Sequence, residues 1–384
     1  MEKETHNYDF IIAGMGAAGL SLAMQLINSK VSFTKVLLID QALKNTNDRT
    51  WCFWTKEKSP WYNETILKKW DHFEFKSHSF SKRFELKPYS YQMIRGIDFY
   101  NYCLDKIKTD SRFEIKTESI TELFSEEHVG KLKTAINTYS AKHIFNSAFR
   151  KNLIKKNDIN FVQHFKGCLI ETEEDTFDVD CPVFMDFRTD QDNDCRFFYI
   201  LPYSKKKALI EYTGFSPKTL NQNEYDLKLT HYIKNQLGIK SYKIEETEYG
   251  EIPMMESEFI NPFGNKVTNI GTAGGNSKPS TGYTFYFIQK TIQNIVKALE
   301  QNVPIKQASN SFKFKLYDKV LLDVIDKKRQ AADTIFTDLF QKNKVTSLLT
   351  FLNEETTLME ELFILNSVNK KAFITSTTKK MLGL

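Results

Sequence analysis

The chain has 384 residues, of which 41% are hydrophobic and 26% carry charge. This length exceeds one ordinary domain and falls short of three, so we expect two interlocked domains, each with its own core. The net charge of +5 is small and the lysines are scattered among carboxylates, which argues against a nucleic-acid-binding protein.

The N-terminal residues predict a strand, a glycine-rich turn, a helix and a second strand. These elements cover Tyr8–Ala13, Gly14–Gly19, Leu20–Asn28 and Lys35–Ile39. Together they form a βαβ unit, which is typical of an α/β domain. The residues ahead of the first strand are polar, so we expect no signal peptide.

The pattern changes in the middle of the chain. Short alternating pieces run through 70–85, and we expect a turn at Pro88–Tyr91 and a helix at Gly96–Ile107. Between about 158 and 252 the residues fall into period-two runs such as 195–200. Alternation of this kind predicts an antiparallel sheet.

The last part of the chain is predicted to be mainly helical. A second glycine-rich stretch, Gly271–Gly282, precedes a helix at Tyr283–Leu299, which suggests that the chain returns to the nucleotide-binding domain. From Ser309 onward, apolar residues recur at helical spacing. The apolar segment Val345–Leu365 could lie on a bilayer surface or cover the core, and its acidic residues favour the core.

Gly14, Gly16 and Gly19 form a GxGxxG turn between a strand and a helix, the context in which this motif binds a dinucleotide. The first glycine permits the turn, the second lets the pyrophosphate approach the backbone, and the third lets the helix press on the strand. Asp40, at the end of the second strand, is placed to hold the ribose hydroxyls. FAD is favoured over NAD because the unit is N-terminal and a second glycine-rich turn lies near Gly271.

The expected fold class is α/β, with a discontinuous Rossmann-type FAD-binding domain, an antiparallel-sheet substrate domain and a helical C-terminal region. The expected ranges are 1–70, 92–157 and 262–308 for the FAD-binding domain, 71–91 and 158–261 for the substrate domain, and 309–384 for the helical region.

Several segments, in a fixed order, resemble bacterial lycopene β-cyclases. The most specific are Asp48–Trp54 (DRTWCFW) and Pro279–Tyr283 (PSTGY). Weaker matches lie between them: YQMIRG at 91–96, QHFKG at 163–167, Met185 and Asp186 with Gln191, YILP at 199–202, Glu211 with Thr213, and GEIP at 250–253.

The resemblance implies an enzyme that binds FAD and needs its reduced form, with NADPH or NADH as reductant, yet catalyses no net redox reaction. Its substrates would be lycopene and related carotenoids. Protonation of an acyclic end closes a six-membered ring through a tertiary carbocation, and loss of a proton leaves the β-ring of γ-carotene or β-carotene.

The expected location follows from the substrate and the cysteines. The five cysteines are odd in number and contain no CxxC pair, which points to a reducing cytoplasm. No apolar run approaches the roughly 20 residues needed to span a bilayer. Because lycopene dissolves in membranes, we expect a cytoplasmic protein that associates peripherally with a membrane surface, and other carotenoid enzymes are candidate partners.

The resemblance assigns proton donation to Glu211, in a segment where relatives carry a second acid in place of Tyr212. A glutamate in an apolar pocket keeps its proton because burial disfavours the charged form. On an alternating strand, Glu211 faces the same side as Leu209 and Thr213. From the residues alone, the alternative is a glutamate that faces solvent.

Asp186 is a second candidate acid, or else a partner for Arg188. Lys278 stands where relatives often carry histidine, so it is assigned no catalytic task, and no metal site is expected. The candidate cofactor-binding residues are Gly14, Gly16, Ala18, Gly19, Asp40, Arg49, Gly271, Gly274, Pro279, Thr281 and Gly282.

Aromatic rings can stabilise the carbocation without trapping it. A cation–π contact contributes about 0.5–2 kcal/mol, whereas an anion ~4 Å away contributes about 4 kcal/mol at an effective dielectric constant of about 20. A reduced, anionic flavin should therefore matter more than any single ring. The candidate substrate-binding rings are Trp51, Phe53, Trp54 and Tyr283, each of which could instead serve packing alone.

Two other functions are compatible with the same motifs. Flavin oxidoreductases such as hydroxylases and polyene desaturases share the GxGxxG unit. A non-catalytic carrier of isoprenoid chains could use the same fold.

Overall fold

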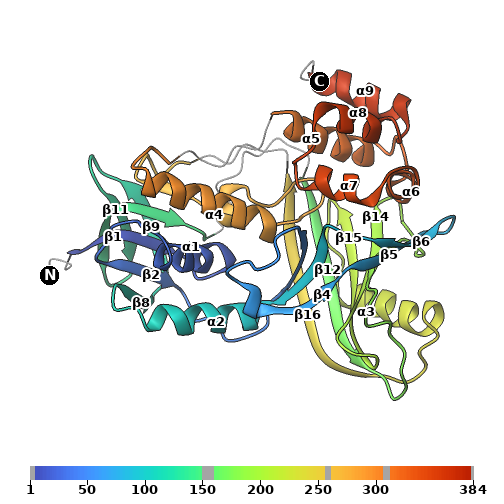
Figure 1. The fold of residues 1–384 in the computed structure, drawn as a ribbon, viewed down its shortest axis with the longest axis horizontal. Helices are drawn as coiled ribbons and strands as arrows, with labels where there is room; N and C mark the ends of the chain where they lie inside the picture. Colours follow the sequence, from blue (N-terminus) through green and yellow to red (C-terminus); the bar gives the residue numbers. More distant parts are fainter. Residues whose placement is uncertain (1–4, 149–159, 256–260, 306–311, 382–384) are drawn as a thin grey trace.

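The computed structural model describes residues 5–148, 160–255, 261–305 and 312–381. Two large sheets lie side by side, and a group of C-terminal helices covers one end of the second sheet (Figure 1). This arrangement confirms the expected α/β fold class with an antiparallel-sheet layer and a helical C-terminal region.

The first sheet carries the N-terminal βαβ unit. Its strands lie in the order β8, β2, β1, β11, β10, β9, with β17 paired to β11. The central strands β2, β1 and β11 are parallel, and the apolar run 10–13 suits a strand buried on both faces. The strands are β1 (Thr5–Ala13), β2 (Val36–Asp40), β8 (Phe113–Thr117), β9 (Ile120–Ser125), β10 (Gly130–Thr134), β11 (Thr138–Asn146) and β17 (Val267–Asn269).

Helices α1 (Ala17–Ile27), α2 (Gly96–Lys108) and α4 (Phe285–Glu300) pack against this sheet. α4 buries an apolar stripe at helical spacing, with Phe285, Ile288, Ile292 and Ile295 on one face. α1 begins three residues before the predicted start, because the helix opens inside the glycine motif. α4 begins two residues after its predicted start, because the preceding Thr284 has a non-helical backbone.

The second sheet is the predicted antiparallel one. Its strand order is β16, β12, β15, β14, β13, β5, β6, and within it only the pairing of β13 with β5 is parallel among the described residues. The strands are β5 (His72–Lys76), β6 (Ser81–Glu85), β12 (Asn160–Glu171), β13 (Val183–Asp186), β14 (Cys195–Pro202), β15 (Lys207–Ser216) and β16 (Lys243–Met255).

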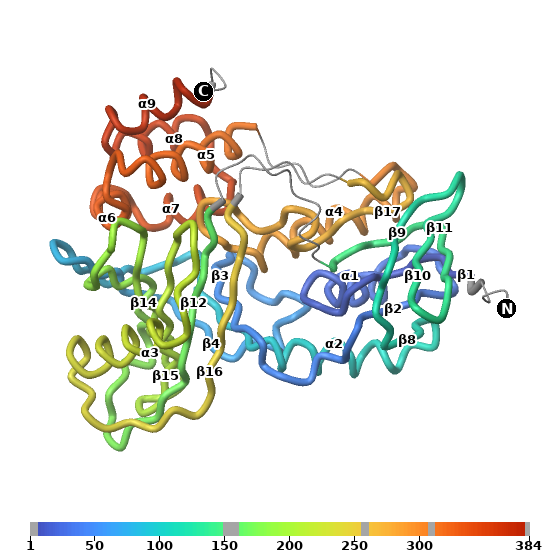
Figure 2. Tube along the Cα trace, turned by 180° about the vertical axis from the view of Figure 1, so that it is seen from behind, coloured from blue at the N-terminus to red at the C-terminus, as the bar shows by residue number. Residues whose placement is uncertain are grey.

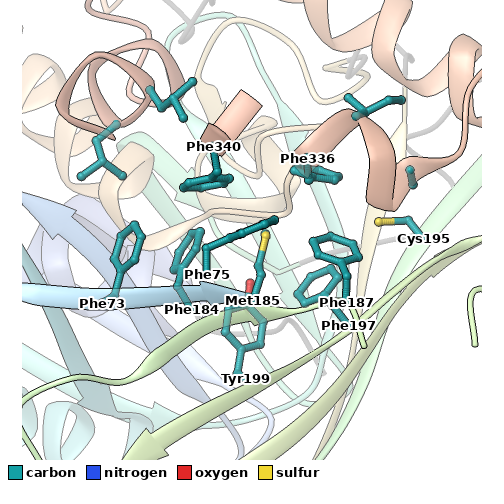
Figure 3. Close-up of a cluster of buried hydrophobic side chains, with 14 of the residues drawn as sticks. Phe73, Phe75, Phe184, Met185, Phe187, Cys195, Phe197, Tyr199, Phe336 and Phe340 are labelled. Carbon is teal, nitrogen blue, oxygen red and sulfur yellow. The ribbon is translucent and has the colours of Figure 1, made fainter. Parts of the chain in front are cut away.

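The two faces of the second sheet have different coverings. One face is covered by α3 (Gln222–His231) and the following π-helical turn Tyr232–Gln236. The other faces the C-terminal helices, where aromatic side chains from strands and helices interdigitate (Figure 3). Phe75 stacks on Phe340 with ring centroids 4.5 Å apart.

A small third sheet contributes side chains to the cores of both large sheets. It contains β3 (Thr50–Thr55), β7 (Ser90–Arg95) and β4 (Ile66–Trp70), with a 3₁₀ turn at Asn63–Thr65. Adjacent β3 residues enter different cores, since Phe53 packs with the first-sheet helices and Trp54 with the second-sheet core. The turn predicted at Pro88–Tyr91 is present slightly earlier, where the Tyr89 N–H donates to the Leu86 carbonyl oxygen at 2.9 Å. Strand β7 begins at Ser90 and runs through the predicted boundary at 91/92.

Helices α5 to α9 lie together at the C-terminal end of the chain, as Figure 2 shows from behind. α7 buries Val345, Leu348 and Leu349, as the core alternative for 345–365 predicts, whereas α8 exposes Leu362 and Phe363. The predicted boundaries at 157/158 and 308/309 lie outside the described residues. The helices are α5 (Phe312–Asp326), α6 (Ala332–Lys342), α7 (Val345–Leu352), α8 (Leu358–Leu365) and α9 (Lys370–Met381).

Candidate functional site

A cleft of about 460 Å³ lies beside the glycine-rich turn between β1 and α1. Gly14 has φ +106°, and a Cβ atom there would lie 2.2 Å from Ser147 Oγ, so only glycine fits. At Gly16 no heavy atom lies within 4 Å of a Cβ, so the backbone faces open space in which a phosphate could approach. The cleft is lined by the predicted Gly14, Gly16, Ala18, Asp40, Arg49 and Gly271, among others.

Gly19 acts in packing and does not line the cleft. A Cβ atom at Gly19 would lie 2.0 Å from the Gly14 carbonyl oxygen, so the absence of a side chain lets α1 approach the turn. Asp40 accepts a hydrogen bond from the Met15 backbone N–H at 2.7 Å, which fixes its carboxylate at the cleft.

A smaller pocket of about 120 Å³ adjoins this cleft, and we call it the acid pocket. Arg49, Trp51, Thr272 and Thr284 line both spaces, so the pocket continues the cleft toward the second sheet. The acid pocket is also lined by Cys52, Tyr91, Gln163, Tyr199, Glu211, Gly282 and Tyr283.

Glu211 projects from β15 into the acid pocket, on the same strand face as Leu209 and Thr213, as the alternation predicts. The Thr213 hydroxyl donates a hydrogen bond to Glu211 Oε1 at 2.7 Å. Burial, and after it the charge of Glu248, raises the pKa of Glu211 well above its ordinary value. The carboxyl group is therefore suited to hold a proton at neutral pH.

Glu248, on β16, is a residue that the sequence analysis missed. The Thr50 hydroxyl donates to Glu248 Oε2 at 2.8 Å, and burial raises the pKa of this carboxyl group as well. In the sequence Glu248 stands in the acidic run 245–248, which reads as a solvated strand edge. The available signal was alternation, which places Glu248 on the face of Gly250 and Ile252.

The structure does not bring Asp186 to Glu211. The Asp186 carboxylate is fully buried, lies 2.7 Å from Arg188 Nη2 and accepts a 2.6 Å hydrogen bond from the Tyr232 hydroxyl. Its partner across the ladder is Phe198, which belongs to the core under α3. Asp186 therefore faces the opposite side of the sheet, in the ion pair that the alternative reading expected.

Two of the four predicted substrate-binding rings line these spaces, and two do not. Trp51 lines the cleft and the acid pocket. Tyr283 lines the acid pocket and an apolar cavity, described below. Phe53 stacks on Phe285 at 4.8 Å, and the Trp54 indole N–H donates to the Leu349 carbonyl oxygen at 3.1 Å. Both are buried in cores and line neither the cleft nor the acid pocket.

The third space is an apolar cavity of about 370 Å³ between β13 and the C-terminal helices. Phe184 and Met185 form its sheet side, and Tyr283 stands between it and the acid pocket. α8 and α9 contribute Leu362 and Ile374, which are also largely exposed, so the cavity reaches the surface there.

Only some of the cofactor-binding residues predicted in the second glycine-rich loop line one of the three spaces. Gly282, with φ +71°, lines the acid pocket, and a Cβ atom there would lie 1.6 Å from Gln163 Oε1. Thr281 lines the apolar cavity, whereas Gly274 and Pro279 line none of the three spaces. Glycine is required at position 274 for local packing, because a Cβ atom there would lie 2.4 Å from the Asn269 carbonyl oxygen.

The site fits a dinucleotide with a polar ring system at its inner end. Among the described residues, Gln163 Oε1 in the acid pocket is buried without a hydrogen-bond partner. Buried polar atoms without partners are rare, so this oxygen is suited to a ligand that carries a hydrogen-bond donor. The same described ranges contain no cluster of three or more side chains that could hold a metal ion.

The fold and cleft define the class of α/β proteins in which a Rossmann-type sheet with a dinucleotide-type cleft lies beside an antiparallel sheet. A flavoprotein/dehydrogenase from Cytophaga hutchinsonii has a similar fold, with TM-score 0.64, 12% identity and coverage of 99% of this chain and 100% of that one. A geranylgeranyl bacteriochlorophyll reductase-like protein from Thermoplasma acidophilum gives TM-score 0.60, 13% identity and coverage of 98% and 97%.

Within this class, the chain belongs to the lycopene cyclase protein family, whose pattern matches residues 9–379. It is 35% identical over 129 residues to the chloroplastic lycopene beta cyclase of Solanum lycopersicum. That match covers 30% of this chain and a quarter (25%) of the tomato protein. In the described part of the chain, no helix is long and apolar enough to cross a membrane.

Proposed function

We propose that this protein is a lycopene β-cyclase that converts the acyclic ψ-ends of lycopene into β-ionone rings, giving γ-carotene and then β-carotene. The observation that carries the proposal is the position of Glu211. This partly buried acid lines a pocket that continues the nucleotide cleft on one side and is separated by Tyr283 from an apolar cavity on the other. Family membership supports a carotenoid as the substrate.

FAD is the cofactor that the cleft and acid pocket suit best. The backbone at Gly14 and Gly16 would meet the pyrophosphate, Asp40 the ribose, and Gln163 the polar edge of the ring system. When bound and reduced by NADPH or NADH, the flavin would supply a negative charge that stabilises a nearby carbocation, with no net electron transfer.

The chemistry of this chain centres on one proton. Glu211 donates it to the terminal double bond, the C–H bond forms as the O–H bond breaks, and the ring closes through a tertiary carbocation. Trp51 and Tyr283 present aromatic faces that stabilise the cation without forming a bond to it. Loss of a ring proton back to the carboxylate then leaves the β-ring and restores the acid, so the reaction is an isomerisation.

The rest of the polyene would occupy the apolar cavity. Its walls are mainly the apolar side chains of α5 to α9 with Phe184 and Met185, and polar groups such as Lys278, Asp318 and Lys370 also line it. Burial of the hydrocarbon there is favourable by about 25 cal/mol per Å² of apolar surface. A long substrate would thus reach the acid past Tyr283 with its distal part held away from water.

Pigment analysis tests the activity directly. Expression in cells that accumulate lycopene should convert the red pigment into cyclic yellow-orange products. Glu211→Gln should fold and retain flavin but lose turnover, whereas Glu171→Gln, an exposed glutamate on β12, should behave as wild type. Unchanged lycopene with the folded wild-type protein would contradict the proposal.

An anaerobic assay separates the proposed cyclase from a flavin oxidoreductase on the same fold. With reduced flavin and lycopene, a cyclase forms product while the flavin stays reduced. An oxidoreductase would show stoichiometric oxidation of the flavin. A non-catalytic carrier would bind lycopene equally well with Glu211→Gln and give no product with either protein.

We also propose that α8 docks on the membrane that holds the substrate. Leu362 is 56% exposed and Phe363 70% exposed, and Leu362 lines the apolar cavity as well. Each apolar side chain moved from water into lipid contributes about 1.5–3 kcal/mol. Replacing Leu362 and Phe363 together by glutamate should therefore weaken binding to phosphatidylcholine vesicles at least about tenfold in a sedimentation assay.

The matched control for the membrane test is Leu227→Glu. Leu227 on α3 is 70% exposed too, but lies in a predominantly polar helix away from the cavity. Its replacement should leave vesicle binding unchanged. Equal losses for both variants, or none for the α8 variant, would remove α8 as the docking helix.

A further inference from the structure

Three strands bring a second carboxyl group to Glu211. Strand β12 lies between β15 and β16, and Gly167 on β12 is the register partner of Glu211 on one side and of Glu248 on the other. Directly opposed residues point to the same face of a sheet. The glycine thus lies between two glutamates and carries no side chain to keep them apart.

The space above Gly167 is occupied by Glu248. A Cβ atom on Gly167 would lie 3.1 Å from Glu248 Cγ and 3.5 Å from Glu248 Oε1. The Glu248 side chain therefore leans over the glycine, toward the strand of Glu211. A side chain at this position would meet Glu248 and also Leu209, whose Cδ1 atom would lie 3.0 Å from the added Cβ atom.

Glu248 Oε1, one of the four carboxyl oxygens of the pair, lacks a hydrogen-bond partner among the described residues. Thr50 donates to Glu248 Oε2 and Thr213 donates to Glu211 Oε1. Glu248 Oε1 is buried and accepts no hydrogen bond from any N–H or other O–H group of the described residues. The group that faces it is the carboxyl of Glu211, and a proton there would satisfy it.

We propose that Glu248 is a positioning residue that shares one proton with Glu211, so that Glu248 is ionised while Glu211 holds the proton and directs it into the acid pocket. This assignment extends the proposed function, and it depends on that function only in the tests that measure activity. The state of the pair itself can be read without substrate.

Charge repulsion is the reason for a single negative charge. Two carboxylates ~4 Å apart repel by about 4 kcal/mol at an effective dielectric constant of about 20, so the pair retains one proton over a wide pH range. The hydroxyl of Thr50 and the charge of Arg49 stabilise the ionised form of Glu248. The proton therefore stays on Glu211, for which no ion pair with a cation is found among the described residues.

Several other titratable groups act on the pair, and the test must allow for them. Their charges are weaker influences than the direct contact of the two carboxyl groups, and none is changed in the variants below. They are Arg49, Cys52, Tyr199, Tyr203, Glu246 and Glu251.

The first test is the pH profile of Glu248→Gln. The cyclase needs Glu211 protonated, so its rate falls as pH rises through the pKa of that group. Without the neighbouring charge this pKa drops, and the alkaline limb should move to lower pH by at least about one unit, with the plateau rate retained. A purely structural role would lower the rate at every pH and leave the limb in place.

Gly167→Ala is the second variant, and it leaves both carboxyl groups present. Its Cβ atom should displace Glu248 and move the limb in the same direction, with no further shift when combined with Glu248→Gln. Glu171→Gln removes an equal charge from the same strand, β12, and should move nothing. If the alkaline limb of the pH–rate profile keeps the wild-type position in both Glu248→Gln and Gly167→Ala, the proposal is wrong.

Infrared titration of the purified flavoprotein gives a readout independent of turnover. The wild-type protein should show the C=O stretch of one protonated carboxyl group at neutral pH, absent from Glu211→Gln and lost at a lower pH in Glu248→Gln. If this band titrates as expected but no lycopene is cyclised, the carboxyl pair stands and the proposed function falls. Absence of the band from the wild-type protein would refute the shared proton.

Discussion

The Lys278 ammonium lies 2.9 Å from the Asp318 carboxylate and 2.8 Å from that of Glu354, and all three groups are buried. Burial alone would lower the pKa of Lys278, but the charges of Asp318 and Glu354 raise it. The lysine thereby connects the loop that carries Thr281 and Gly282 to α5 and to the turn after α7. No catalytic task is predicted for Lys278 from the sequence, and in the structure it has this linking position.

We expect Lys278→Met to destabilise the protein by about 3–5 kcal/mol, because it removes the buried cation that pairs with the carboxylates of Asp318 and Glu354. Denaturant unfolding followed by circular dichroism measures this. Lys290→Met is the control, since Lys290 is exposed and lies 4.0 Å from Glu355, and an exposed pair contributes at most about 1 kcal/mol. Similar losses in the two variants would mean that the buried network is not what holds the loop.

Two glycines of the first turn should respond differently to alanine. Gly14→Ala should cost about 1–3 kcal/mol of stability, because φ +106° is strained for any residue with a side chain and the new Cβ atom meets Ser147. Gly16→Ala should leave the unfolding free energy within about 0.5 kcal/mol, since its φ is −82° and its Cβ atom meets nothing.

Flavin content separates these two effects. Gly16→Ala should weaken FAD binding at least about tenfold, because its methyl group enters the cleft where the pyrophosphate would approach the backbone. The measurement is flavin absorbance per mole of purified protein, followed by titration with FAD. Normal flavin content in Gly16→Ala would place the dinucleotide elsewhere.

Asp186→Asn should affect stability and leave the chemistry intact. The substitution breaks the charge pair with Arg188, which is partly exposed, so we expect a loss of about 2 kcal/mol. Turnover per folded molecule should stay within about twofold of wild type, because Asp186 faces the α3 side of the sheet. A large loss of turnover with unchanged stability would restore Asp186 as a catalytic acid.

The contrast between Glu211, Asp186 and Glu248 shows what the sequence could and could not predict. Glu211 lies in a regular strand, where alternation alone gives the correct face. Asp186 follows an irregularity in β13, so that it faces away from Phe184 although the two are two residues apart. The meeting of Glu248 with Glu211 depends on the registers of two strand pairs across Gly167, which no local pattern encodes.

The glycine-rich turn was predictable for the opposite reason. Its strand, turn and helix are consecutive, and the motif needs glycine at Gly14 and Gly19 for close packing and at Gly16 for an open backbone beside the cleft. Gly274 and Pro279 lie in a comparable loop, yet line none of the three spaces. Their loop is placed by tertiary contacts such as the one between Lys278 and Asp318, and these contacts cannot be read from spacing.

Tyr283 should control passage between the apolar cavity and the acid pocket. Its ring lies edge-on to Trp54, with centroids 4.7 Å apart, and lines both spaces. Tyr283→Phe keeps the ring and should retain turnover. Tyr283→Ala removes an aromatic face worth about 0.5–2 kcal/mol to a carbocation, so kcat should fall about two- to thirty-fold.

The control for this last prediction is a buried ring that lines neither space. Phe53→Leu loses the stack on Phe285 and should lower stability while leaving kcat per folded molecule near wild type. Lycopene turnover at saturating substrate, measured beside a thermal melt, distinguishes the two effects. If Tyr283→Ala turned over lycopene as fast as Tyr283→Phe, the carbocation would have to form away from this ring, and the path from the apolar cavity to Glu211 would have to avoid it.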